Sequence, residues 1–276
     1  MRDGLAVGIA LTTDPDQSRG LLEEFCRCLA QATGVRVTAH GMWHYHHLLE
    51  ALSAGQLDLV WLPPILALRA TARAGCVPIA IPVRHGVSTY STALFTRPDS
   101  RIRNTDDLQG VRAAWVDRQS AAGYLIIRAL LRSNGVDLTK AFAHEKFLGT
   151  HDAVAQAVLE GEVDVGATFV YLDSDGSETR SAGWGDAKVH IVCHAGSIPS
   201  DLIAVRKGLR SETRETIKKA LVDLDDAELA RAARNLLGAE AFVVPNEKHL
   251  ERLLVILEHL EDSGAPMHTQ FPPPRP

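Results

Sequence analysis

Two stretches of this chain are copies of one structural unit. Tyr45–Trp61 (YHHLLEALSAGQLDLVW) and His151–Ala167 (HDAVAQAVLEGEVDVGA) align without a gap. Each stretch predicts an amphipathic helix, a glycine that ends it and a short aliphatic strand. Two such units far apart in one chain predict two similar α/β lobes. Ligands of such sheets bind outside the carboxyl ends of the strands, where helices begin. We therefore expect Tyr45 and His151 to face a shared cleft.

Length and charge exclude several classes of protein. A chain of 276 residues is long enough for two lobes. Its net charge of −5 argues against a nucleic-acid partner, which needs a basic face. No apolar run approaches the roughly 20 residues that span a bilayer, so we expect no membrane insertion. We also expect no signal peptide and a cytoplasmic location, or a periplasmic one if a leader was removed.

Strands and helices alternate along the chain, which predicts a mostly parallel sheet in each lobe. We expect lobe one to comprise residues 1–86 and 195–268, and lobe two residues 87–194. Residues 173–185 predict a flexible loop, and residues 188–193 and 202–205 predict strands returning to lobe one. The C-terminal region is expected to be helical over residues 212–224, 227–236 and 247–261 and to pack on lobe one. The Pro-rich tail 269–276 is expected to be disordered. Two chain crossings between lobes permit hinge closure on a ligand.

Four strings resemble the phosphate/phosphite/phosphonate-binding branch of ABC-transporter substrate-binding proteins, which have the type II periplasmic-binding-protein fold. They are Tyr45 with LLEALSAGQLDLVWLPP, Tyr90 with STALFTRPDSRIRNTDDLQG, VDRQSAAGYLIIRALLRSNGVD from Val116, and GTHDAVAQAVLEGEVDVGA from Gly149. SIPSDLIAVRKGL from Ser197 is a weaker match. The resemblance implies a two-lobed α/β fold with a ligand cleft between the lobes.

The resemblance also implies site residues. In this family the loop similar to Asp117–Gly123 carries a Ser-Thr-Ser cluster, whose hydroxyls hold a tetrahedral oxyanion at a helix N-terminus. This chain keeps Ser120, but Ala121 and Ala122 stand at the other two positions. His151, Tyr45 and Tyr90 match ligand-contacting positions. The lost hydroxyls disfavour bare phosphate and simple phosphonates, and favour a larger anion with an apolar or aromatic part.

Each candidate also has a structural interpretation. Tyr45 shares a helical face with leucines and fits a core position, whereas His151 fits an exposed first turn. Ser120 is a helix N-cap in either case. Tyr90 fits a packing role at the hinge. Trp61 ends its strand at the expected edge of the cleft.

Other polar clusters favour structural roles. His40, His44, His46 and His47 lack the spacing and the additional ligands of a metal site, so we expect no metal and no cofactor. The aligned residues Asp58 and Asp164 follow helix-ending glycines at the strand ends away from the cleft, which favours a role in a turn. The four cysteines form no CxxC motif and are expected to be free thiols.

We therefore expect a non-catalytic protein that clamps a small anionic ligand between two lobes. Its partner would be an ABC transporter or a signalling protein. The alternative is a cytosolic enzyme of lyase or synthase type on the same fold, similar to enzymes of menaquinone or thiamine-pyrimidine synthesis. In that case His151 would be the acid or base, because histidine titrates near neutral pH.

Overall fold

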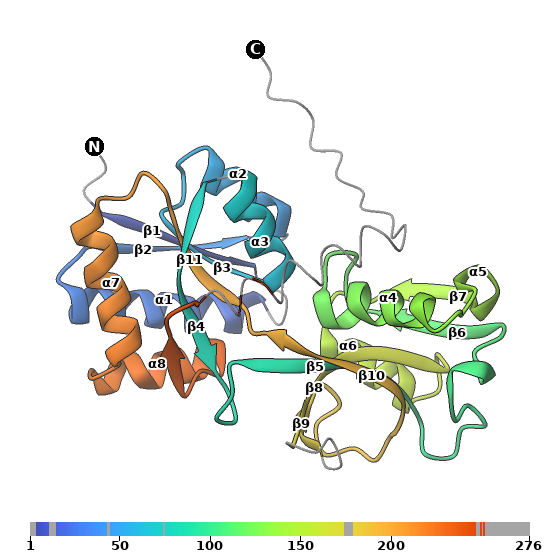
Figure 1. Ribbon diagram of the computed structural model, residues 1–276. Helices are drawn as coiled ribbons and strands as arrows, with labels where there is room; N and C mark the ends of the chain where they lie inside the picture. Colours follow the sequence, from blue (N-terminus) through green and yellow to red (C-terminus); the bar gives the residue numbers. More distant parts are fainter. Residues whose placement is uncertain are drawn as a thin grey trace.

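The computed structural model describes residues 4–10, 15–42, 45–73, 75–173, 179–246, 249 and 251. It has two α/β lobes, each built on a mixed sheet, and strands β5 and β10 lead from one lobe into the other (Figure 1). This is the α/β architecture expected from the repeated unit.

The first sheet has the strand order β12-β4-β11-β3-β1-β2. Its strands are β1 (Leu5–Ala10), β2 (Val37–Met42), β3 (Leu59–Leu62), β4 (Cys76–Val83), β11 (Leu202–Arg206) and β12 (Ala241–Val243). β1 is buried along its whole length and pairs in parallel with β2 and β3. Buried residues of α1 (Pro15–Thr33), α7 (Ser211–Asp223) and α8 (Ala227–Leu237) cover one face, and those of α2 (Tyr45–Ser53) and α3 (Pro64–Arg73) cover the other. Strands buried on both faces read as continuous apolar runs, which explains the sequence of β1.

The second sheet has the order β10-β5-β8-β6-β7, with β9 paired to β8. Its strands are β5 (Thr89–Thr96), β6 (Val111–Trp115), β7 (Phe142–Phe147), β8 (Val165–Leu172), β9 (Thr179–Ala182) and β10 (His190–Pro199). A π-helical turn, η2 (Ala121–Leu125), continues into α4 (Ile126–Ser133) and packs on one face together with the short α5 (Leu138–Ala141). Helix α6 (His151–Leu159) packs on the other face. A 3-10 turn, η1 (Thr105–Asp107), precedes β6.

Two expectations about the strands were wrong. The sheets are mixed rather than mostly parallel, because the strands next to the lobe crossings, β5, β10 and β11, run antiparallel to their neighbours. Strand β10 pairs with β5 as far as Pro199, and the chain then enters the first sheet at β11. The expected loop over residues 173–185 contains β9, which pairs with β8. The partners of β5, β10 and β11 are distant in sequence, so local patterns carry no signal for these pairings. Strand β9 follows β8 directly, but it is only four residues long and mostly polar (TRSA), so its sequence resembles a loop.

The repeated unit is built in the same way in both lobes. After α2, the N–H groups of Gln56 and Leu57 both donate to the carbonyl of Ala51. After α6, Glu162 and Val163 donate to Ala157 in the same pattern. Both intervening glycines, at positions 55 and 161, have positive φ, which glycine adopts without steric cost.

The aligned aspartates complete this correspondence. An Asp58 oxygen accepts a hydrogen bond from the Ala6 N–H of β1 at 2.9 Å, and the carboxylate pairs with Arg206. An Asp164 oxygen accepts from the Arg112 N–H of β6 at 2.8 Å and also binds the Arg112 side chain. Each carboxylate therefore ties the strand that follows it, β3 or β8, to the neighbouring parallel strand, β1 or β6, which is a structural role.

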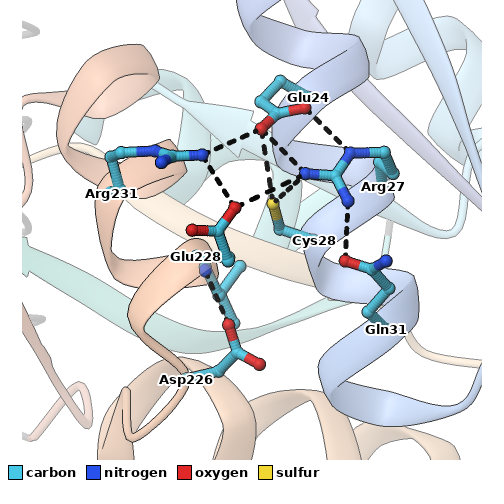
Figure 2. Close-up of polar contacts among 8 residues, drawn as sticks. Glu24, Arg27, Cys28, Gln31, Asp226, Glu228 and Arg231 are labelled. Atoms are coloured by element: carbon cyan, nitrogen blue, oxygen red, sulfur yellow. Dashed lines mark hydrogen bonds and ion pairs between the residues drawn. The ribbon is translucent and has the colours of Figure 1, made fainter.

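The C-terminal helices α7 and α8 pack against α1 through apolar residues of the first core. Figure 2 shows a polar network across the α1–α8 contact, in which Glu24 and Arg27 of α1 meet Glu228 and Arg231 of α8. These side chains are 37% to 58% exposed, so each pair contributes little to stability. The helix expected over residues 247–261 and the tail 269–276 lie almost wholly outside the described residues.

The four cysteines are free; Cys26, Cys28 and Cys76 are buried, and Cys193 is partly buried. Within the described part of the chain, no helix is long and apolar enough to cross a bilayer. The same residues contain no group of histidine, cysteine and carboxylate side chains arranged to hold a metal. His44, from the cluster considered above, lies outside them.

Candidate functional site

A cavity of about 480 Å³ lies between the two lobes. The first lobe contributes Ala10 at the end of β1 and Trp61 on β3, both at the carboxyl edge of the sheet. The second lobe contributes the loop before η2, the start of α6 and part of β8. The volume is within the range of small-molecule sites.

The N-terminus of the η2–α4 helix lies at the wall of this cavity. Ser120 is the N-cap, and its Oγ accepts a hydrogen bond from the Gly123 N–H at 3.0 Å. Ala121 and Ala122 are each 3% exposed and line the cavity. A Cβ on Gly123 would lie 2.3 Å from a Val116 methyl, so only glycine fits this tight loop. The first N–H groups of a helix have no intrahelical acceptor, which makes this wall suited to an anion.

The loop is held in place from the neighbouring strand. The Thr92 hydroxyl on β5 donates to the Ala122 carbonyl at 2.6 Å, and Thr92 is fully buried. The loop backbone is therefore fixed before any ligand arrives, which reduces the entropic cost of binding.

His151 is the first residue of α6, which packs on the face of the second sheet opposite to the η2–α4 helix. Thr150 caps the helix by accepting from the Ala153 N–H, which fixes the first turn. The His151 Nδ1 lies 2.7 Å from the Thr168 hydroxyl, and its ring meets Phe169 edge-on at 5.0 Å between centroids. Burial lowers the pKa of His151 to about 4, so the imidazole is neutral at pH 7. A neutral imidazole can hydrogen-bond a ligand but adds no charge.

Aromatic rings continue from His151 toward the hinge. Phe169 and Tyr171 on β8 are 6.0 Å apart, and Tyr171 lies 6.3 Å from Tyr90 and 4.9 Å from His85. All of these rings line the cavity. Trp61 belongs to the first lobe, and its buried indole N–H lies close enough to Asp201 to lower the pKa of that carboxyl. The cavity therefore combines a helix N-terminus at one end with an aromatic wall.

An ion pair joins the two connections between the lobes. Arg84 follows β4 and Asp201 precedes β11; the guanidinium lies 3.2 Å from the carboxylate and donates to the Leu237 carbonyl at 2.8 Å. Burial raises the pKa of the Asp201 carboxyl above its ordinary value, and Arg84 opposes that effect. Both residues line the cavity.

Six of the seven residues selected from the sequence lie on this one cavity: Trp61, Tyr90, Ser120, Ala121, Ala122 and His151. Tyr45 begins α2, and its side chain lies outside the described residues. The ligand-binding role of these seven residues stays a prediction. Sequence reasoning did not select Arg84, Phe169, Tyr171 or Asp201. The string from Ser197 that resembles the family contains Asp201, whereas the other three had no local signal.

The chain matches the family model for the periplasmic substrate-binding protein of phosphonate ABC transporters over residues 7–250. A curated relative is the phosphonates-binding periplasmic protein of Escherichia coli K12, 24% identical over 89% of this chain and 73% of its own length. Among solved structures, a binding-protein component of an ABC phosphonate transporter from Pseudomonas aeruginosa has a TM-score of 0.78 at 20% identity, covering 95% of this chain and 88% of that one. A Xanthomonas citri protein bound to ATP has a TM-score of 0.74 at 20% identity, covering 95% and 98%.

These similarities establish the type II periplasmic-binding-protein fold. They give the enzyme alternative no support, since the relatives in the family are binding proteins of transporters. Because the family model covers most of its length, this chain belongs to the periplasmic substrate-binding proteins of phosphonate ABC transporters.

Proposed function

We propose that this protein is a non-catalytic binding protein that clamps an organic anion carrying an apolar or aromatic group, and presents it to an ABC transporter. The observation that carries the proposal is the lining of the cavity: Ala121 and Ala122 occupy its helix N-terminus, and aromatic rings form the adjoining wall.

The anionic end of the ligand would meet dipoles rather than full charges. The N–H groups at the start of η2, the Ser120 hydroxyl and the neutral His151 ring are all available there. Backbone N–H groups at a helix N-terminus stabilise an anion without a counter-charge. Phosphonate, sulfonate and carboxylate groups all satisfy this geometry, so this end selects for an anion rather than for one particular acid.

The alanine pair reduces the affinity for a bare oxyanion. A hydroxyl that donates to a charged oxygen contributes about 1.5–3 kcal/mol, so two missing hydroxyls weaken binding by roughly a hundredfold or more. Two methyl groups in their place give the apolar part of a larger ligand a surface to contact. Stacking on Phe169, Tyr171 and Tyr90 would recover affinity through apolar burial.

The family relationship supports the role in transport. We propose that the protein acts in the periplasm, like its curated relative, and that its physiological partner is the membrane component of a transporter. The ligand would move from solvent to the cavity and from there to that partner.

The test is calorimetric binding of phenylphosphonate, methylphosphonate and inorganic phosphate to the full chain. We expect phenylphosphonate to bind at least tenfold more tightly than methylphosphonate, and to raise the melting temperature. Equal or tighter binding of methylphosphonate or phosphate would overturn the proposed ligand class.

A loop variant sharpens this test. Ala121→Thr combined with Ala122→Ser returns hydroxyls to the helix N-terminus, and we expect it to tighten methylphosphonate binding by at least tenfold. Thr139→Ala, on the surface helix α5 away from the cavity, should leave both affinities unchanged. A loop variant with unchanged preference would show that these two positions do not set ligand size.

A further inference from the structure

Thr168 is a fully buried threonine on β8 whose hydroxyl contacts the ring of His151. Its relative exposure is 0%, and the Oγ1–Nδ1 distance of 2.7 Å is that of a strong hydrogen bond. Either atom can supply the proton, depending on the tautomer of His151. Which one does so decides what the other ring nitrogen offers to the cavity.

The buried hydroxyl itself indicates the direction of this bond. Among the described residues, Nδ1 of His151 is the hydrogen-bond partner recorded for the Thr168 side chain. If Nδ1 carried the proton, the Thr168 O–H would be left buried without an acceptor, which costs about 1–3 kcal/mol. If Thr168 donates to Nδ1, both groups are satisfied. The proton of the neutral ring then resides on Nε2.

Gly183 closes the space around this hydroxyl. A Cβ at position 183 would lie 2.0 Å from Thr168 Oγ1 and 3.1 Å from its Cβ. The backbone at Gly183 is fixed in turn by its N–H, which donates to the Phe169 carbonyl at 3.1 Å. The hydroxyl is therefore confined between the Gly183 backbone and the His151 ring.

The edge-on contact with Phe169 holds the ring orientation from a second side. A histidine fixed at Nδ1 and at one ring edge has a single nitrogen, Nε2, left for other partners. His151 lines the cavity.

We propose that Thr168 is a positioning residue that fixes His151 in the Nε2–H tautomer, so that the cavity meets a neutral hydrogen-bond donor at this position. The part of this inference that concerns the ligand rests on the proposed function. There, the Nε2–H group of His151 would donate a hydrogen bond to the oxyanion that binds at the N-terminus of η2. The role of Thr168 in the unliganded protein stands independently of it.

The test begins with the unliganded protein. Nitrogen-15 spectra of the histidine rings at pH 7 distinguish the protonated from the unprotonated ring nitrogen. We expect His151 to carry its proton on Nε2 in the wild type and in Thr168→Ser, and to show a mixture or the Nδ1–H form in Thr168→Val. Thr96→Val is the matched control, because Thr96 is also buried on the second sheet but donates to the Asp164 carbonyl, away from the cavity.

Binding of phenylphosphonate is the second arm. We expect Thr168→Val to weaken binding about tenfold, Thr168→Ser to restore it and Thr96→Val to leave it unchanged. An Nδ1–H tautomer in the wild type, or an unchanged tautomer in Thr168→Val, would overturn the inference whatever the ligand. A wild type that shows the Nε2–H tautomer but binds no phenylphosphonate would instead contradict the proposed ligand class.

Discussion

His151 shows how a single side chain acquires its chemistry from its surroundings. In the sequence it is one of 12 histidines, at the start of a helix. In the structure it is enclosed by Thr168 and Phe169, and burial disfavours its charged form. The same enclosure makes it a poor general acid at pH 7, because a neutral ring whose pKa is near 4 has no readily released proton.

The lowered pKa of His151 predicts a pH dependence of stability. The unfolded chain, with a histidine pKa near 6.5, binds more protons than the folded one between about pH 6.5 and pH 4. The contribution is therefore complete above pH 6.5 and is lost as the pH falls toward 4, with a magnitude of about 3 kcal/mol. Urea unfolding at pH 7 and pH 5 should show this loss in the wild type and a smaller loss in His151→Asn. His144→Asn, at an exposed position on β7, should behave like the wild type.

The cysteines lead to a prediction at the same scale. Burial raises the pKa of Cys26 to about 12 and that of Cys193 to about 11. Burial also raises the pKa values of Cys28 and Cys76. Because the thiolate is the reactive form, native protein at pH 8 should react with Ellman's reagent far more slowly than free cysteine does. In denaturant all four thiols should react at once. Rapid labelling of the native protein would contradict this assignment.

At the scale of elements, the two repeated units can be compared directly. Asp58 and Asp164 make the same backbone hydrogen bond to the neighbouring parallel strand, but their side chains are 5% and 32% exposed. Removing Asp58 leaves the buried Ala6 N–H without its acceptor, whereas the Asp164 site is partly open to water, so its unpaired groups can be solvated. Loss of this aspartate should therefore reduce stability more in the first lobe than in the second.

We expect Asp58→Ala to lower the free energy of unfolding by about 2–3 kcal/mol, and Asp164→Ala by about 1 kcal/mol. Denaturant titration of both variants measures the difference. Asp99→Ala removes a carboxylate that is 81% exposed and should cost little. Equal losses at positions 58 and 164 would show that burial does not set the difference.

At the scale of the whole molecule, the described chain crosses between the lobes at residues 84–88 and 199–201. The Ser200 N–H donates to the Ser88 carbonyl, and Arg84 pairs with Asp201, so the two crossings are joined to each other. Short joined connections favour rotation of the lobes about one axis. The cavity lies between the lobes beside this hinge, and Arg84 and Asp201 are part of its lining.

Ligand binding should therefore close the molecule. We expect the radius of gyration from small-angle X-ray scattering to fall when phenylphosphonate saturates the protein, toward the roughly 19 Å of a compact chain of this length. Glucose, which is uncharged, serves as the control and should leave the scattering unchanged. Binding with no change in the radius of gyration would mean that the lobes do not move on this ligand.

The sequence by itself determined the fold class, most helices and strands, and the family. These depend on local periodicity, on helix-ending glycines such as Gly55 and Gly161, and on strings of residues that lie together in the chain. The cleft position of Tyr45 is still a prediction, since its side chain lies outside the described residues.

Only the tertiary structure decided which strands pair and what surrounds the cavity. The sequence of strand β10 does not reveal its partner β5, whose paired residues lie 94 to 110 positions earlier in the chain. Arg84 and Asp201, and likewise His151 and Thr168, become partners only when distant segments are brought together. Such contacts depend on three-dimensional proximity, and the pKa values and hydrogen-bond directions that follow from them are not encoded in any local pattern of residues.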